Sequence, residues 1–126
     1  MIHEEICTYE LCKLAKDKGF PQHIGNDAYI EENEYDDEYE VGCCYPIQFI
    51  PDYLPTITAP TQSLLQRWLR EEKGVDIAVV PVSEVYAYIV YNILCIENRI
   101  KGTNAGYATY ELALEDALKY ALENLV

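Results

Sequence analysis

Apolar residues at helical spacing define the first predicted element, which runs from Thr8 to about Lys18. The residues that recur at intervals of three and four, and so share one face of a helix, are Leu11, Leu14 and Ala15. Thr8 can cap the first turn, and Gly19 is a good residue to end the helix. Pro21 follows and prevents its continuation. The chain is therefore predicted to begin with a short amphipathic helix.

The clearest predicted helix begins beside Pro60 and ends at Gly74. Its apolar stripe consists of Leu64, Leu65, Trp68 and Leu69. Its polar face is expected to carry Gln62, Gln66, Arg67, Arg70 and Glu71. Such a pattern indicates a helix that packs on a core along one side and meets solvent along the other.

A last helix is predicted from Thr109, a natural cap, to near the C-terminus. The residues at helical spacing are Ala113, Leu114, Ala117, Leu118, Ala121, Leu122 and Leu125. Because three of these seven residues are alanine, the helix can approach a sheet closely.

Between the last two helices, β-branched and aromatic residues predict two strands, Val75–Val82 and Val85–Ile96. The short link between them suits a hairpin, and Lys101–Gly106 is predicted to be a turn. Residues 22–58 are expected to form an irregular segment with room for a β-hairpin. The fold class is therefore α+β: three helices packed on a small antiparallel sheet, in the order helix, irregular segment or hairpin, helix, β-hairpin, helix. At 126 residues the chain is expected to be a single domain, 1–126.

Charge changes this picture in one place, the run from Glu31 to Glu40. Seven of its ten residues are acidic and two are tyrosines. The run therefore supplies −7 of the net charge of −13. The rest of the chain has 15 acidic and 9 basic residues, a net charge of −6. Nucleic acid and anionic membranes select for clustered Lys and Arg and should repel this chain. Tyrosine is enriched at protein interfaces. The candidate protein-contact surface is therefore Glu31, Glu32, Glu34, Tyr35, Asp36, Asp37, Glu38, Tyr39 and Glu40.

Residues that could carry catalysis or hold a metal do not form a recognisable constellation. The five cysteines and two histidines lack the spacing of a zinc site, and the acidic run lacks the central glycine of a calcium loop. Ser63 falls within a predicted helix, without a nucleophile elbow. The acidic surroundings of Cys43-Cys44 should raise the pKa of these thiols and disfavour a nucleophilic role. We expect no catalytic residue, no metal and no cofactor.

The cysteines also bear on the compartment. They are odd in number, and the N-terminus shows no secretory pattern, so reduced thiols in the cytoplasm are expected. No apolar stretch is long enough to cross a bilayer.

Three segments resemble a family of small proteins of uncharacterised function that is common in phages, prophages and mobile elements of gut anaerobic bacteria. The central block is Ala-Pro-Thr-Gln-Ser-Leu-Leu-Gln-Arg-Trp-Leu-Arg-Glu at 59–71. Flanking it are Thr8–Glu10 with Lys18–Phe20, and a last helix similar to 110–118. The resemblance covers the three helices, roughly half the chain, and implies an intracellular, phage-related context without an activity. The acidic run is where the chain departs most from the family.

The leading hypothesis is a small non-catalytic accessory protein that binds another protein, such as a basic one, through its acidic, tyrosine-rich surface. Two alternatives remain open: a cryptic enzyme or metal-dependent protein, and a nucleic-acid mimic that inhibits a host DNA-binding protein. A homo-oligomer is a further possibility, with Trp68 or the strand face of Tyr86 and Tyr88 at its interface.

Overall fold

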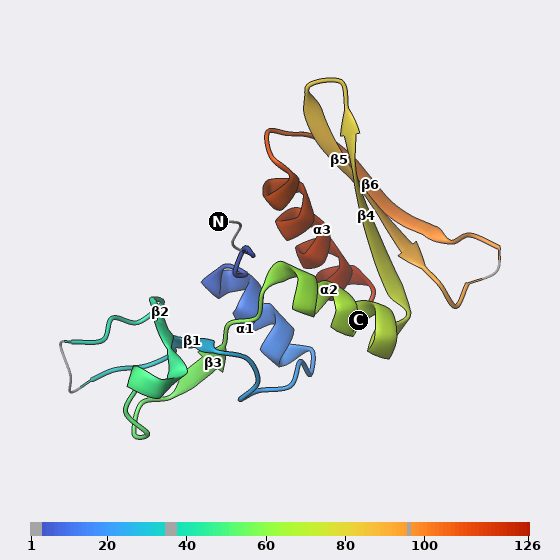
Figure 1. Cartoon of the computed structure of the whole chain (residues 1–126). Helices are drawn as coiled ribbons and strands as arrows, with labels where there is room; N and C mark the ends of the chain where they lie inside the picture. Colours follow the sequence, from blue (N-terminus) through green and yellow to red (C-terminus); the bar gives the residue numbers. More distant parts are fainter. Residues whose placement is uncertain (1–3, 35–37, 96) are drawn as a thin grey trace. The chain divides into compact units, whose positions relative to one another are not determined.

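The computed structural model describes residues 4–34, 38–95 and 97–126 and divides the chain into two compact units (Figure 1). One unit is Ile6–Thr61, and the other comprises Gln62–Val126 with Glu4 and Glu5. The described residues form three α-helices and two antiparallel sheets of three strands each. The predicted α+β class is confirmed, but the strands form two sheets where one was expected. That the whole chain folds as a single domain stays a prediction.

In the unit Ile6–Thr61, the first helix is α1, Tyr9–Asp17. The Thr8 side chain accepts a hydrogen bond from the Leu11 amide, so the predicted cap is confirmed. The buried residues of the helix are Leu11, Cys12 and Ala15. Its apolar face therefore lies toward the core of this unit, and β3 is the strand that it contacts.

The segment expected to be irregular holds a small sheet in the order β2-β1-β3. Its elements are β1 (Asp27–Ile30), β2 (Cys44–Pro46), the 3-10 helix η1 (Ile47–Phe49) and β3 (Thr56–Thr58). Ala28 in the central strand pairs with Tyr45 on one side and Thr58 on the other. Among the side chains of this unit that are at most 1% exposed, Ile30 and Ile57 are the largest. A few short strands thus build a core in spite of three prolines nearby.

The other unit begins with α2 (Gln62–Lys73) and continues with β4 (Val75–Val82), β5 (Val85–Asn92), β6 (Ile100–Tyr107) and α3 (Tyr110–Asn124). The strand predicted over 85–96 ends earlier, at Asn92. The turn predicted at Lys101–Gly106 is wrong, because these residues belong to β6 and pair with β5. The sheet order is β4-β5-β6.

Gly102 shows why a glycine-containing segment can be a strand here. A Cβ atom at Gly102 would lie 2.5 Å from Cε1 of Tyr120 on α3, so the ring covers the strand where it has no side chain. The Tyr120 hydroxyl also donates a hydrogen bond to the Lys101 carbonyl. The helix thus supplies the contacts that a strand of this composition lacks.

Both helices of this unit contact strand β4, and α3 also contacts β5 and β6. The predicted inner face of α3 is confirmed, with Ala113, Leu114, Ala117, Leu118, Ala121 and Leu122 all buried. Leu65 and Leu69 of α2 are fully buried, whereas Leu64 and Trp68 are half-buried.

Gln62 is a correction to the predicted polar face of α2. Its side chain is 4% exposed, and its amide donates 2.9 Å hydrogen bonds to the Glu111 carbonyl and to Glu115 Oε2. A buried amide is tolerated where its donors are satisfied, and α3 provides both acceptors. The start of α2 is thereby tied to the start of α3.

No helix among residues 4–34, 38–95 and 97–126 combines the length and the apolar character needed to cross a membrane.

Candidate functional site

The acidic run forms the connection between β1 and β2 in the unit Ile6–Thr61. The Gly42 amide donates to the Ile30 carbonyl at 2.8 Å, and the Ile30 amide donates to the Cys43 carbonyl at 3.1 Å. These two hydrogen bonds join the end of β1 to the residues just before β2, at the base of the connection. We call residues 31–34 and 38–40 the acidic connection. Tyr35, Asp36 and Asp37 were predicted to belong to the contact surface and lie outside the described residues.

Tyr39 holds one side of the acidic connection in place. Its hydroxyl donates a 2.6 Å hydrogen bond to the Phe49 carbonyl, and its ring meets Tyr45 edge-on with 5.2 Å between the centroids. The Asn33 side-chain amide donates to the Tyr39 carbonyl, which links the two arms of the connection. Tyr45 adds a further link, since its hydroxyl accepts from the Glu40 amide at 3.1 Å. Tyr39 is thus an anchor of the loop as well as a candidate contact residue.

The carboxylates of the acidic connection have different surroundings. Glu31 is half-buried and pairs with Lys16 of α1 at 3.1 Å. The Cys43 thiol donates to Glu40 Oε2 at 3.5 Å. The remaining ones, Glu32, Glu34 and Glu38, are exposed like Glu40. Four carboxylates are therefore open to solvent on one hairpin connection.

Exposed apolar side chains follow directly in the chain, which the sequence pattern did not reveal. Phe49 is 64% exposed, Tyr53 65% and Val41 52%. Large apolar side chains at the surface are informative when they gather in one region, and these three fall within thirteen residues of one another in a single unit. We call Val41, Phe49 and Tyr53 the apolar rim of the acidic connection.

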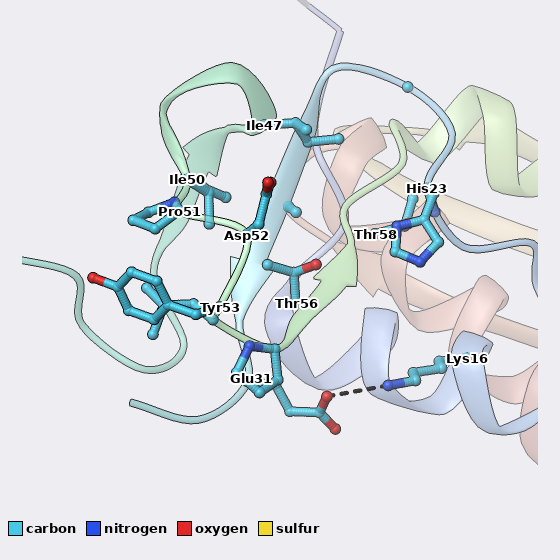
Figure 2. A pocket seen from close by; sticks show the side chains of 14 residues that line it. Lys16, His23, Glu31, Ile47, Ile50, Pro51, Asp52, Tyr53, Thr56 and Thr58 are labelled. Carbon is cyan, nitrogen blue, oxygen red and sulfur yellow. Dashed lines mark hydrogen bonds and ion pairs between the residues drawn. The ribbon is translucent and has the colours of Figure 1, made fainter. Parts of the chain in front are cut away.

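A pocket of about 620 Å³ lies in the same unit, with Tyr53 and Glu31 in its lining (Figure 2). This volume is within the usual range of ligand sites. Its lining residues are Lys16, His23, Gly25, Ala28, Glu31, Ile47, Ile50, Pro51, Asp52, Tyr53, Leu54, Pro55, Thr56 and Thr58. In Figure 2, Asp52 and His23 lie apart, and the marked ion pair joins Lys16 to Glu31. The lining therefore combines carboxylates and hydroxyls with apolar side chains.

His23 occupies a special position in this pocket. Its φ of 67° is in the left-handed region, which few non-glycine residues adopt. The His23 amide donates to Thr58 Oγ1 at 2.7 Å, and the Gln22 side-chain carbonyl accepts from the Thr58 amide at 2.9 Å. These two bonds hold the strained turn against β3 and give the pocket a fixed wall.

All five cysteines are free thiols. Burial raises the pKa of Cys44 to about 11, with the Asp27 charge acting in the same direction. Burial also raises the pKa of Cys43, as does its hydrogen bond to Glu40. The predicted upward direction is confirmed, although burial comes before charge as the cause. At Cys95 a hydrogen bond with the Asn98 backbone lowers the pKa, and the nearby Lys101 charge acts in the same direction.

Cys95 is therefore expected to react with iodoacetamide before Cys44. With the Cys44 pKa at about 11 and that of Cys95 below the ordinary 9.0, the thiolate fractions at pH 8 differ on the order of 100-fold. The lower nucleophilicity of a low-pKa thiolate reduces this to a rate ratio of about tenfold or more. Timed labelling of the native protein, read by peptide mass spectrometry, measures the ratio. Cys95→Ser should remove the fast phase, and equal rates at Cys44 and Cys95 would contradict the expectation.

The part of the chain that the structure describes holds no group of three or more His, Cys, Asp or Glu side chains able to bind a metal ion.

Comparison of the chain with protein-family models, with curated proteins and with solved structures finds no significant match.

Proposed function

We propose that this protein is a small non-catalytic accessory protein that binds a basic protein partner through the acidic connection and its apolar rim. The observation that carries the proposal is the joint placement of exposed carboxylates and exposed apolar groups on one unit: Glu32, Glu34 and Glu38 with Phe49 and Val41. Interfaces commonly combine an apolar anchor with a polar surround. The proposal keeps the phage-related context implied by the resemblance.

The partner's chemistry follows from this placement. The unit Ile6–Thr61 holds 11 acidic and 3 basic residues, a net charge of −8, so it attracts a basic surface at long range. Phe49 is 64% exposed, so a partner that covers it would remove apolar surface from water. That burial contributes favourably to the free energy of binding. The pocket that Tyr53 lines could then receive a lysine or an arginine of the partner beside Asp52, because the other lining carboxylate, Glu31, is already paired with Lys16.

Affinity purification from the native host at low and high salt tests the proposal with matched variants. Glu32, Glu34 and Glu38 are changed together to Gln, and the control changes Glu72, Glu84 and Glu97, which are equally exposed and lie in the other unit. The first variant should lower recovery of the partner at least about tenfold at low salt, because charge steering and pairing are lost. The control should lower it far less, and high salt should weaken binding of the wild type.

A second pair of variants separates the apolar rim from charge. Phe49→Ser should also reduce recovery of the partner, whereas Leu112→Ser, at a residue 55% exposed on α3, should not. Failure to recover any specific partner at low salt, or equal losses for a variant and its control, would overturn the proposal. Displacement of a recovered partner by duplex DNA would favour the nucleic-acid mimic.

A further inference from the structure

In the unit that contains the sheet β4-β5-β6, the helices α2 and α3 contact the same face of the sheet. Val75, Ile77, Tyr88 and Val90 are all buried, and their register, with Ile77 opposite Val90, places them on the face that α2 and α3 contact. Tyr86 and Tyr88 lie on this face too, since their rings meet Tyr110 and Tyr120 of α3. The strand face suggested from the sequence for a homo-oligomer is therefore occupied by the protein's own helix.

Alternation along each strand places the remaining residues on the other side, which we call the outer face. From the middle of the two strands to the hairpin end, its pairs are Ala78 with Ile89, Val80 with Ala87, and Val82 with Val85. All six side chains are apolar, and Val80 and Val82 are 36% and 47% exposed. Strand β6 continues the face with Ala105 opposite Ala87 and Thr103 opposite Ile89. An antiparallel sheet face that meets solvent normally carries polar side chains, so this composition indicates a face that is covered in use.

Charge identifies the occupant. Alternation gives the outer face two charged residues, Asp76 of β4, which is paired with Arg70 at 3.8 Å, and Lys101 near the start of β6. A chain of net charge −13 repels its own copy, and the outer face is a surface where two copies can meet with little repulsion between like charges. A nucleic acid or a basic protein would find no cluster of complementary charge there. A flat apolar face is self-complementary, as a two-fold interface requires.

Area is consistent with a reversible dimer. Strands of eight residues extend about 27 Å, and three strands span about 14 Å, which gives roughly 400 Å² per copy before side-chain relief is counted. Doubling this footprint gives roughly 800 Å² for two copies, below the usual size of a stable interface, as expected of a weak and reversible dimer. We propose that the outer face of β4-β5-β6 binds the same face of a second copy, as two sheets packed face to face.

The test is the concentration dependence of mass for the full chain, measured by sedimentation velocity from about 1 to 500 μM. The wild type should approach twice the 14.5 kDa of one chain as concentration rises. Val80→Lys should raise the dissociation constant at least tenfold, because a lysine would be buried against its copy. Val82→Lys, near the hairpin end, is a second variant that disturbs the sheet less. Leu112→Lys, at a residue 55% exposed on α3, is the matched control and should leave the constant unchanged.

Circular dichroism of each variant shows whether its fold is kept. A wild type that keeps the mass of one chain at 500 μM would overturn the proposal. It would also fail if both folded outer-face variants dimerised like the wild type, or if Leu112→Lys alone abolished the dimer. Raising the salt concentration to 0.5 M should preserve this apolar contact while it weakens binding at the acidic connection, so the two proposals succeed or fail separately.

Discussion

Replacing Leu118 with alanine is expected to lower the free energy of unfolding by about 2–5 kcal/mol. Leu118 is fully buried near the middle of α3, on the side that contacts the sheet β4-β5-β6. The substitution removes apolar contacts and leaves a cavity that a helix held at both ends cannot close. Both effects reduce the stability of the folded state.

Urea denaturation followed by the fluorescence of Trp68 measures this change, because the chain has one tryptophan and it lies in the same unit. Leu112→Ala is the control on the same helix, at a residue 55% exposed, and should change stability by about 0.5 kcal/mol or less. A loss under about 1 kcal/mol for Leu118→Ala would mean that α3 does not pack on the sheet as described.

Replacing Ile30 with alanine is expected to cost a similar amount, about 2–5 kcal/mol, in the other unit. Ile30 is fully buried at the end of β1, the central strand of the sheet β2-β1-β3. This small sheet has few large buried side chains, so the loss of one leaves little else to hold the strands together. Ile47→Ala, at a residue 39% exposed, is the control of the same residue type.

The pair of core variants also tests the single-domain prediction. If the chain unfolds as one cooperative domain, Ile30→Ala will lower the midpoint reported by Trp68 as Leu118→Ala does. If the two units unfold independently, Ile30→Ala will shift a transition seen by circular dichroism while the Trp68 midpoint stays in place. The second result would contradict a single domain.

The helices could be predicted because the signals for them, a capping residue and apolar residues at helical spacing, lie within each helical segment itself. Thr8 caps α1 as expected, and Thr109 accepts from the Leu112 amide at the start of α3. Strand β6 could not be predicted, because its glycines and asparagine have low strand propensity and its pairing depends on β5 and on Tyr120. Burial of Gln62 was missed for a similar reason, since its acceptors lie about fifty residues away in α3.

Only the charged part of the candidate surface could be predicted from the sequence. Charge counting identifies the acidic residues directly, because a run of carboxylates stays at the surface in any fold. The sequence did not single out Phe49 and Val41, because composition assigns an apolar residue to the core unless the fold places it elsewhere. Only the path of the chain around β2 and η1 determines that both are exposed.

The contact between Gly102 and Tyr120 has a consequence for evolution. Any side chain at position 102 would collide with the ring, and a smaller residue at position 120 would give up the hydroxyl bond to Lys101. A substitution at either position alone is therefore expected to lower the stability of the fold, so the two residues should change together during evolution. Where a descendant or ancestor of this chain carries a larger residue at the first position, a small residue is expected at the second. The pair can therefore serve as a signature for finding distant members of this lineage whose surfaces have diverged.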